Sequence, residues 1–143
     1  MAEVAHFVPK ATLDARDNLL EFIQLCREKL SAFGGPSTWD EDRWQHGVTV
    51  AVFATATAPT TSYSWTPLAD PFRQFAKSYI RYGYSHRPVV SVQYRIQALR
   101  CLEAALLSGT GEADVLKLSG AVMDASAQFA REFFASDDSL HKT

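Results

Sequence analysis

Apolar residues recur at steps of three and four along several stretches of this chain, and this helical period limits its fold more than any other feature. In residues 12–33 the recurring side chains form one face of an amphipathic helix: Leu19, Phe22, Ile23, Cys26, Leu30 and Phe33. Thr12 is the expected N-cap, and Asp14 and Asp17 lie in the first turns, where the helix dipole favours acids. Residues 34–36, Gly-Gly-Pro, supply the stop signal. The sequence therefore predicts a helix over residues 12–33.

The same period predicts three more helices. The first starts near Asp70, with Pro71 at its first position, and runs to residue 82 or 83. The second covers residues 91–107 and is ended by the glycines that follow, and the third begins after Ser119 as N-cap. Their expected inward residues are Phe72, Phe75, Ala76, Tyr79 and Ile80, then Val92, Ile96, Leu99, Leu102 and Leu106, then Val122, Met123, Phe129, Ala130 and Phe133.

Residues 37–67 have a different character. Residues 48–53 are rich in β-branched side chains and lack helix caps, which indicates a short hairpin or an extended arm near residues 39–65. Residues 59–62 form the expected loop, before Tyr63, Trp65 and Pro67. The predicted fold is mainly α: a compact bundle of four to five helices with this hairpin or arm. We divide it into residues 1–67, a helical bundle over 68–135 and a flexible tail at 136–143, together one compact domain.

Composition excludes several classes of protein. Of the 143 residues, 47% are apolar and 21% charged, so the chain has enough apolar side chains to form a core. Its apolar runs are far shorter than the roughly 20 residues that cross a bilayer, and its start lacks the features of a signal peptide. We expect a soluble, cytoplasmic protein that has no contact with membranes.

Residues that would carry chemistry are scattered. Cys26 and Cys101 lie among leucines and are expected to be buried thiols, and the four histidines lack metal-ligand spacing. The sequence contains no phosphate loop, nucleophile elbow or complete dinucleotide fingerprint. Residues 40–42, Asp-Glu-Asp, could bind a cation but are expected to form a solvated turn. We therefore predict no catalytic residue, metal or cofactor.

Charge is unevenly distributed, although the net formal charge is only −2. Residues 73–100 hold six Lys or Arg and no acid, whereas residues 1–72 and 101–143 each carry a net −4. A basic block between acidic ones is typical of a domain that presents one face to a polyanion. The spacing of Arg73, Lys77 and Arg81 places them on one helical stripe, which we expect to lie away from the aromatic face.

The basic block also carries a resemblance to a known family. Residues 70–82, His86-Arg87-Pro88 and residues 95–107 resemble the amino-terminal region of phage-type integrases, the tyrosine recombinases. The match follows the pattern F-A-K-x-x-[IL]-R, a short basic loop and R-x-x-A-L-R-x-L-E-x-A-L, and it covers roughly residues 65–134. It implies a SAM-like core-binding bundle that grips duplex DNA, while a separate carboxy-terminal domain cuts strands. The family's catalytic Arg, His and Tyr set has no counterpart in this chain, so the resemblance implies a fragment without enzymatic activity.

Seven residues are the candidate DNA contacts. They come from two predicted helices and the loop that joins them: Arg73, Lys77, Arg81, His86, Arg87, Arg95 and Arg100. Their positive side chains would neutralise phosphates and release counterions. Tyr82 and Tyr84 could stack on exposed bases. We assign Tyr79 to the core and place Arg100 near its edge.

Two other functions compete with DNA binding. A helical protein-interaction or assembly domain would use the acidic helix over residues 12–33 and exposed tryptophans to meet a partner protein. A small enzyme is the weakest reading, because the sequence advertises no pocket with converging polar groups. Under the leading hypothesis the partners are double-stranded DNA, the protein's own carboxy-terminal catalytic domain and, as an open alternative, further copies of the chain on DNA.

Overall fold

A computed structural model describes residues 4–55 and 66–133 of the chain. In chain order the elements are α1 (Ala15–Glu28), the 3-10 helix η1 (Ala32–Thr38), β1 (Arg43–His46), β2 (Thr49–Val52), α2 (Phe72–His86), α3 (Gln93–Thr110), the 3-10 helix η2 (Val115–Lys117) and α4 (Gly120–Phe133). The prediction of a mainly helical bundle with a short hairpin is confirmed. The predicted tail at residues 136–143 lies outside the described residues.

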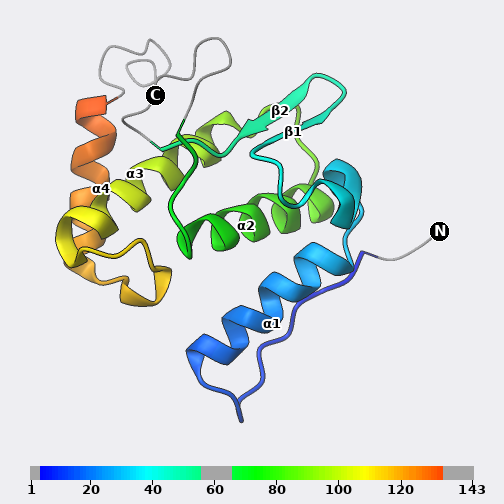
Figure 1. Ribbon diagram of the computed structural model, residues 1–143, viewed down its shortest axis with the longest axis horizontal. Helices are drawn as coiled ribbons and strands as arrows, with labels where there is room; N and C mark the ends of the chain where they lie inside the picture. Colours follow the sequence, from blue (N-terminus) through cyan, green and yellow to red (C-terminus); the bar gives the residue numbers. More distant parts are fainter. Residues whose placement is uncertain (1–3, 56–65, 134–143) are drawn as a thin grey trace.

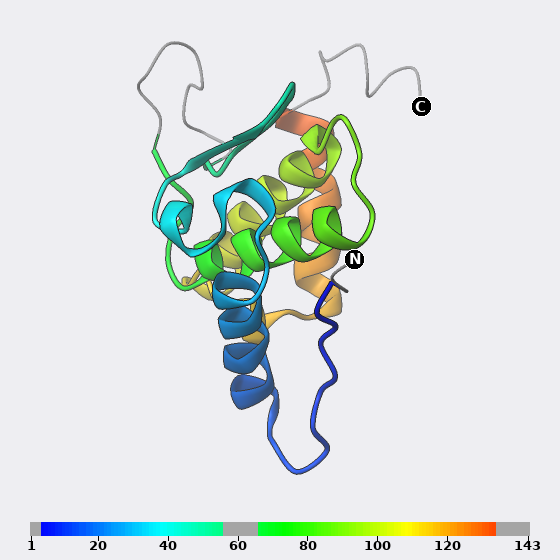
Figure 2. The ribbon, with the colours of Figure 1, turned by 90° about the vertical axis from the view of Figure 1, so that its right-hand side faces the viewer.

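Helix α2 occupies the centre of the molecule. Figure 1 shows the β1–β2 hairpin above it, α1 below it, and α4 packed along α3. Figure 2 shows α1 standing out from the bundle, with the amino-terminal segment running beside it. The ring of Phe7 in that segment packs on Phe22 of α1 at 5.1 Å between centroids. Helix α2 is therefore covered by α1, by η1 with the hairpin, and by α3.

Helix α1 is shorter than predicted at both ends. Asp14, not Thr12, is the N-cap, and its Oδ1 accepts a hydrogen bond of 2.8 Å from the amide of Asp17. The helix ends at Glu28 because the chain turns soon afterwards: Phe33, Gly34 and Gly35 all have positive φ angles, of 57°, 98° and 64°. Phe33 therefore reaches the core from the turn instead of from a continuous helix face.

The hairpin confirms the β character of residues 48–53. Strands β1 and β2 pair antiparallel, with Trp44 opposite Ala51, and both of these side chains are buried. Gly47, at φ 59°, supplies the left-handed position that the tight turn requires. The loop expected at residues 59–62, and Tyr63 and Trp65, lie outside the described residues.

The later helices keep their predicted order, although their ends shift by a few residues. Helix α2 begins after Pro71 and runs to residue 86, and α3 ends at Gly111 in the left-handed conformation. Ser119 caps α4, because its Oγ accepts from the amide of Val122. Two inward assignments are wrong: Tyr79 is 45% exposed and Met123 is 51% exposed. The side chain of Phe133 is outside the described part.

One cluster of buried apolar side chains joins the two halves of the sequence. It extends from Ile23 of α1 through Trp44 and Phe53 of the hairpin segment to Ile80 of α2 and Leu106 of α3. Cys26 and Cys101 are both buried, as predicted. Within the described ranges, no helix has the length and apolar character needed to cross a membrane.

Candidate nucleic-acid interface

The cations of α2 face the protein interior, which contradicts the predicted exposed stripe. Lys77 and Arg81 are 0% exposed, and the side chain of Arg73 is 23% exposed. On an α-helix the row 73, 77, 81 lies about 100° from the apolar row that includes Phe72 and Ile80, so both rows are covered when neighbours pack on two sides. Here α3 and the hairpin with η1 supply that cover, and the solvent side of α2 carries Tyr79 instead.

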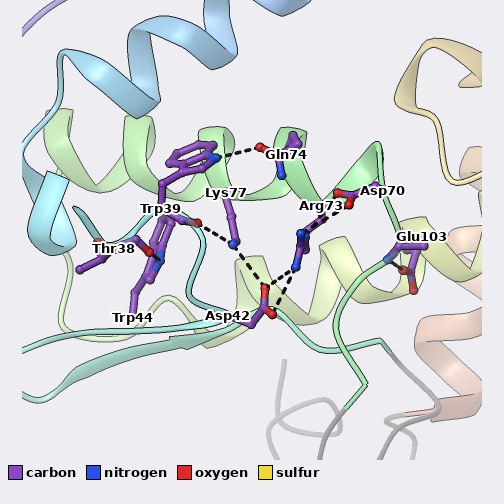
Figure 3. Close-up of polar contacts among 10 residues, drawn as sticks. Thr38, Trp39, Asp42, Trp44, Asp70, Arg73, Gln74, Lys77 and Glu103 are labelled. Atoms are coloured by element: carbon purple, nitrogen blue, oxygen red, sulfur yellow. Dashed lines mark hydrogen bonds and ion pairs between the residues drawn. The ribbon is translucent and has the colours of Figure 1, made fainter. Parts of the chain in front are cut away.

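Asp42 neutralises two of these cations. Its carboxylate lies 3.3 Å from Nζ of Lys77 and accepts from Nη1 of Arg73 at 3.2 and 3.3 Å (Figure 3). The ammonium of Lys77 also donates to the carbonyl of Trp39 at 2.6 Å, and Arg73 pairs with Asp70 at 3.3 Å. The prediction of a solvated acidic turn is therefore wrong for Asp42, whose side chain is only 18% exposed.

Arg81 secures the turn that follows α1. Its Nη1 donates to the carbonyl of Gly35 at 2.8 Å, and its Nη2 donates to Oγ1 of Thr38 at 3.2 Å. The guanidinium carbon lies 4.2 Å from the ring centroid of Trp44 and 5.1 Å from that of Trp39, within the range of a cation–π interaction. Arg81 is thus a structural cation that holds η1 against α2.

The protein-interaction alternative requires exposed tryptophans, but the two that line this cluster are buried. Trp39 and Trp44 are 3% and 1% exposed, and their indole nitrogens donate to Oε1 of Gln74 and to the carbonyl of Thr38 (Figure 3). Burial with satisfied N–H groups is the usual arrangement for core tryptophans. They cannot form the partner surface that we considered from the sequence.

Burial dominates the electrostatics of the cluster. Desolvation lowers the pKa of Lys77, and the nearby carboxylate of Asp42 opposes this effect. Desolvation also lowers the pKa of Arg81 to about 10, and it raises the pKa of the Cys26 thiol to about 12. A group held in this environment cannot exchange its protein partners for a phosphate without unfolding the turn. The α2 cations are therefore removed from the set of DNA contacts.

Arg100 also works inside the fold. Its Nη2 donates to the carbonyl of Thr55 at 3.0 Å, one turn of α3 away from the buried Glu103. The carboxylate of Glu103 accepts from Oγ1 of Thr55 and from the amide of Ala69. These two α3 side chains therefore hold the chain at Thr55 and at Ala69. The position of Arg100 at the edge of the core is confirmed, but its guanidinium serves the fold.

The remaining candidates gather where α2 turns into α3. Arg87 follows the last turn of α2 and is exposed, and Arg95 is partly exposed in the first turn of α3. The Nη1 atom of Arg95 is itself buried next to Gly83 and has no hydrogen-bond partner in the described structure, so only the rest of its guanidinium can meet a phosphate. His86 lies between the rings of His6 and Tyr82, at 4.4 and 4.1 Å between centroids. We call residues 86–95 the elbow.

Tyr82 and Tyr84 are committed to internal contacts. The hydroxyl of Tyr82 accepts from the amide of Phe7 at 3.0 Å, and the hydroxyl of Tyr84 lies 2.8 Å from Nδ1 of His46. Tyr84 is 9% exposed. Neither ring is presented as a platform for bases, so the stacking role considered from the sequence is not supported by this arrangement.

The sequence pattern did not reveal the acidic partner of the basic block. Asp42 lies outside residues 73–100, and only the fold brings it to Arg73 and Lys77 of α2. One general signal was available. The segment that forms α2 carries a basic row beside its apolar row, and a basic row that becomes buried needs acidic partners from another part of the chain. In residues 4–55 and 66–133, no three His, Cys, Asp or Glu side chains assemble as a metal site would require. Comparison with family models, curated proteins and solved structures finds no match.

Proposed function

We propose that the chain binds duplex DNA through the elbow, as the amino-terminal clamp of a site-specific tyrosine recombinase whose catalytic domain is separate. The resemblance of residues 65–134 to the integrase core-binding region supports the family assignment. The elbow lies within that region, and it is the contact site that we propose. The observation that carries the proposal is the exposed Arg87 next to the first turn of α3, where Arg95 also lies.

The amino end of α3 adds to the attraction for phosphate. Helix α3 has 18 residues and no side-chain cap from Val92, its N-cap residue. The amide of Gln93 donates to Oγ of Ser91 at 3.3 Å, and the helix end still carries the partial positive charge that favours a phosphate oxygen. The exposed Gln93 and Tyr94 occupy the same turn and would lie against the sugar-phosphate backbone. The elbow can therefore position the domain on a duplex with few cations.

The interface is smaller than the seven-residue set predicted from the sequence. Lys77 and Arg81 are buried, Arg100 is bound to a carbonyl, and Arg73 is held by two aspartates. The permanent charge of the interface therefore comes from Arg87 and Arg95. Two phosphate contacts correspond to a salt dependence with a slope of about −2 in a plot of log affinity against log salt concentration. Binding by this domain alone should therefore be weak and sensitive to salt.

Titration of a fluorescein-labelled duplex at several salt concentrations tests the proposal. The variant Arg87→Ala/Arg95→Ala should lose most of the affinity and reduce the slope by about 2. The matched control is Arg16→Ala/Arg27→Ala, which removes the same charge from α1 and should leave both quantities unchanged. Equal losses in the two variants would mean that net charge alone drives binding. Binding that is undetectable or insensitive to salt would refute the proposal and favour a protein-interaction domain.

A further inference from the structure

An apolar groove lies between α1 and η2. Its apolar lining consists of Leu19, Leu20, Ile23, Pro71, Val115 and Leu116, and Gln74 of α2 also lines it. Of these, Ile23 is buried, whereas Leu20 is 57% exposed and Leu116 is 38% exposed, so the two leucines present apolar surface to solvent. The groove encloses about 220 Å³, enough for one or two branched aliphatic side chains.

Two arginines mark the ends of this groove. Arg16, Leu20, Ile23 and Arg27 follow one another at steps of four, three and four, so they form a single stripe along α1. The backbone positions of the two arginines are three helical turns apart, about 16 Å along the axis. Arg27 forms an ion pair with its exposed neighbour Glu28, and Arg16 has no ion pair within residues 4–55 and 66–133.

The acids of α1 lie on a different side of the helix. Asp17, Glu21 and Glu28 fall on a row about a third of a turn away from the arginine stripe. Asp114, at the η2 side of the groove, accepts a hydrogen bond from the amide of Leu116 and so caps η2. The groove is therefore mainly apolar and has an arginine at each end, of which Arg27 also pairs with the exposed Glu28. This pattern favours a partner that presents carboxylates on either side of an apolar side chain.

We propose that this groove binds an amphipathic helix of a partner protein. A leucine-type side chain of that helix occupies the space between Leu20 and Leu116, and carboxylates three turns apart face Arg16 and Arg27. A helix fits because its own repeat reproduces the spacing of the α1 stripe and presents leucine and acids on one face. The apolar lining disfavours nucleic acid as the occupant. The groove shares no residue with the elbow, so this proposal and DNA binding can fail independently.

Two synthetic helical peptides test the proposal against the full chain. Both are alanine-rich with central leucines; one carries a glutamate at each end of the leucine face, three turns apart, and the other carries lysines at the same positions. Fluorescence anisotropy should show binding of the glutamate peptide and at least about tenfold weaker binding of the lysine peptide. Arg16→Glu/Arg27→Glu should reverse that preference, which a merely destabilised protein could not do.

Variants separate the groove from the rest of the surface. Leu20→Ser/Leu116→Ser should weaken binding of the glutamate peptide about tenfold or more, while the control Val48→Ser, at an 83% exposed position in the hairpin turn, should not. Circular dichroism should report the parent fold for each variant, because these side chains are exposed. The proposal is overturned if neither peptide binds or if the charge exchange leaves the preference unchanged. Self-association of the chain that Leu20→Ser abolishes would also overturn it, because a second copy would then be the occupant.

Discussion

Replacing Asp42 with asparagine should destabilise the protein strongly, because the change leaves the buried ammonium of Lys77 without its acid. At an effective dielectric constant of about 20, opposite unit charges 3.3 Å apart attract each other by about 5 kcal/mol. Water reaches the partly exposed Asp42 and offsets part of that attraction, and Arg73 retains Asp70. We expect Asp42→Asn to lower the free energy of unfolding by about 3 kcal/mol, near the lower end for a broken buried pair.

The assay is chemical denaturation with linear extrapolation, supported by thermal unfolding. A loss of about 3 kcal/mol corresponds to a fall of about 10 °C in the melting temperature of a chain of this size. The matched control is Asp40→Asn in the same turn, an exposed position that should cost less than about 0.5 kcal/mol. Adding Lys77→Met to Asp42→Asn should recover at least half of the loss, because it removes the uncompensated charge and keeps an apolar stem.

The pH dependence of the same variant gives a second measure. Burial lowers the pKa of Lys77 from its ordinary 10.5, and Asp42, with a weaker contribution from Asp40, opposes this effect while Arg73 adds to it. Without Asp42 the pKa of Lys77 in the folded protein falls further. The unfolded chain then binds more protons than the folded protein over a wider pH range below 10.5. The free energy of unfolding of Asp42→Asn should therefore rise with pH, and its deficit should shrink between the two folded-state pKa values. A loss of stability in Asp42→Asn below about 0.5 kcal/mol would refute this reasoning. A loss that stays constant over this pH range and is not relieved by Lys77→Met would also refute it.

Three further outcomes follow from particular contacts. Gly34→Ala should cost about 2 kcal/mol in thermal unfolding, because its Cβ would lie 2.5 Å from Cγ2 of Thr38 at a φ of 98°, whereas Gly109→Ala inside α3 should be neutral or stabilising. Cys26 should not react with a thiol reagent in the native state, because it is buried with a pKa raised to about 12, and it should react in denaturant; fast native reaction would contradict its burial. Glu103→Met should cost about 2 kcal/mol, since a thioether of similar length accepts neither hydrogen bond and leaves the amide of Ala69 without its acceptor, and an unchanged melting temperature would argue against that role.

The helices were predictable from sequence because each carries its own local signals. The apolar period identified α1, α2, α3 and α4, and Gly111 and Ser119 marked a real end and a real start. The end of α1 was misjudged because its apolar period continues into the turn. Leu30 and Phe33 are buried, but they reach the core from η1 and the residues next to it.

The candidate site was only partly predictable, because helical spacing does not reveal which row of a helix is covered. The step of four that joins Arg73, Lys77 and Arg81 is the same whether the row meets water or a hairpin. Its cover comes from Trp39 and Trp44, far away in sequence, and no local pattern connects them to α2. Arg87, which follows the last turn of α2, is exposed as expected.

The contacts that hold Thr55 beside Thr66 and tie Thr55 and Ala69 to α3 have a practical consequence for engineering. The amide of Thr55 donates to the carbonyl of Thr66 at 2.9 Å, and Glu103 ties the neighbouring backbone to the helix, so the exit and entry points sit side by side. Chain-closure entropy grows only logarithmically, and doubling the length between such points costs about 0.6 kcal/mol. A fluorescent reporter or an affinity tag can therefore be spliced between Thr55 and Thr66 while the helical scaffold keeps its melting temperature nearly unchanged.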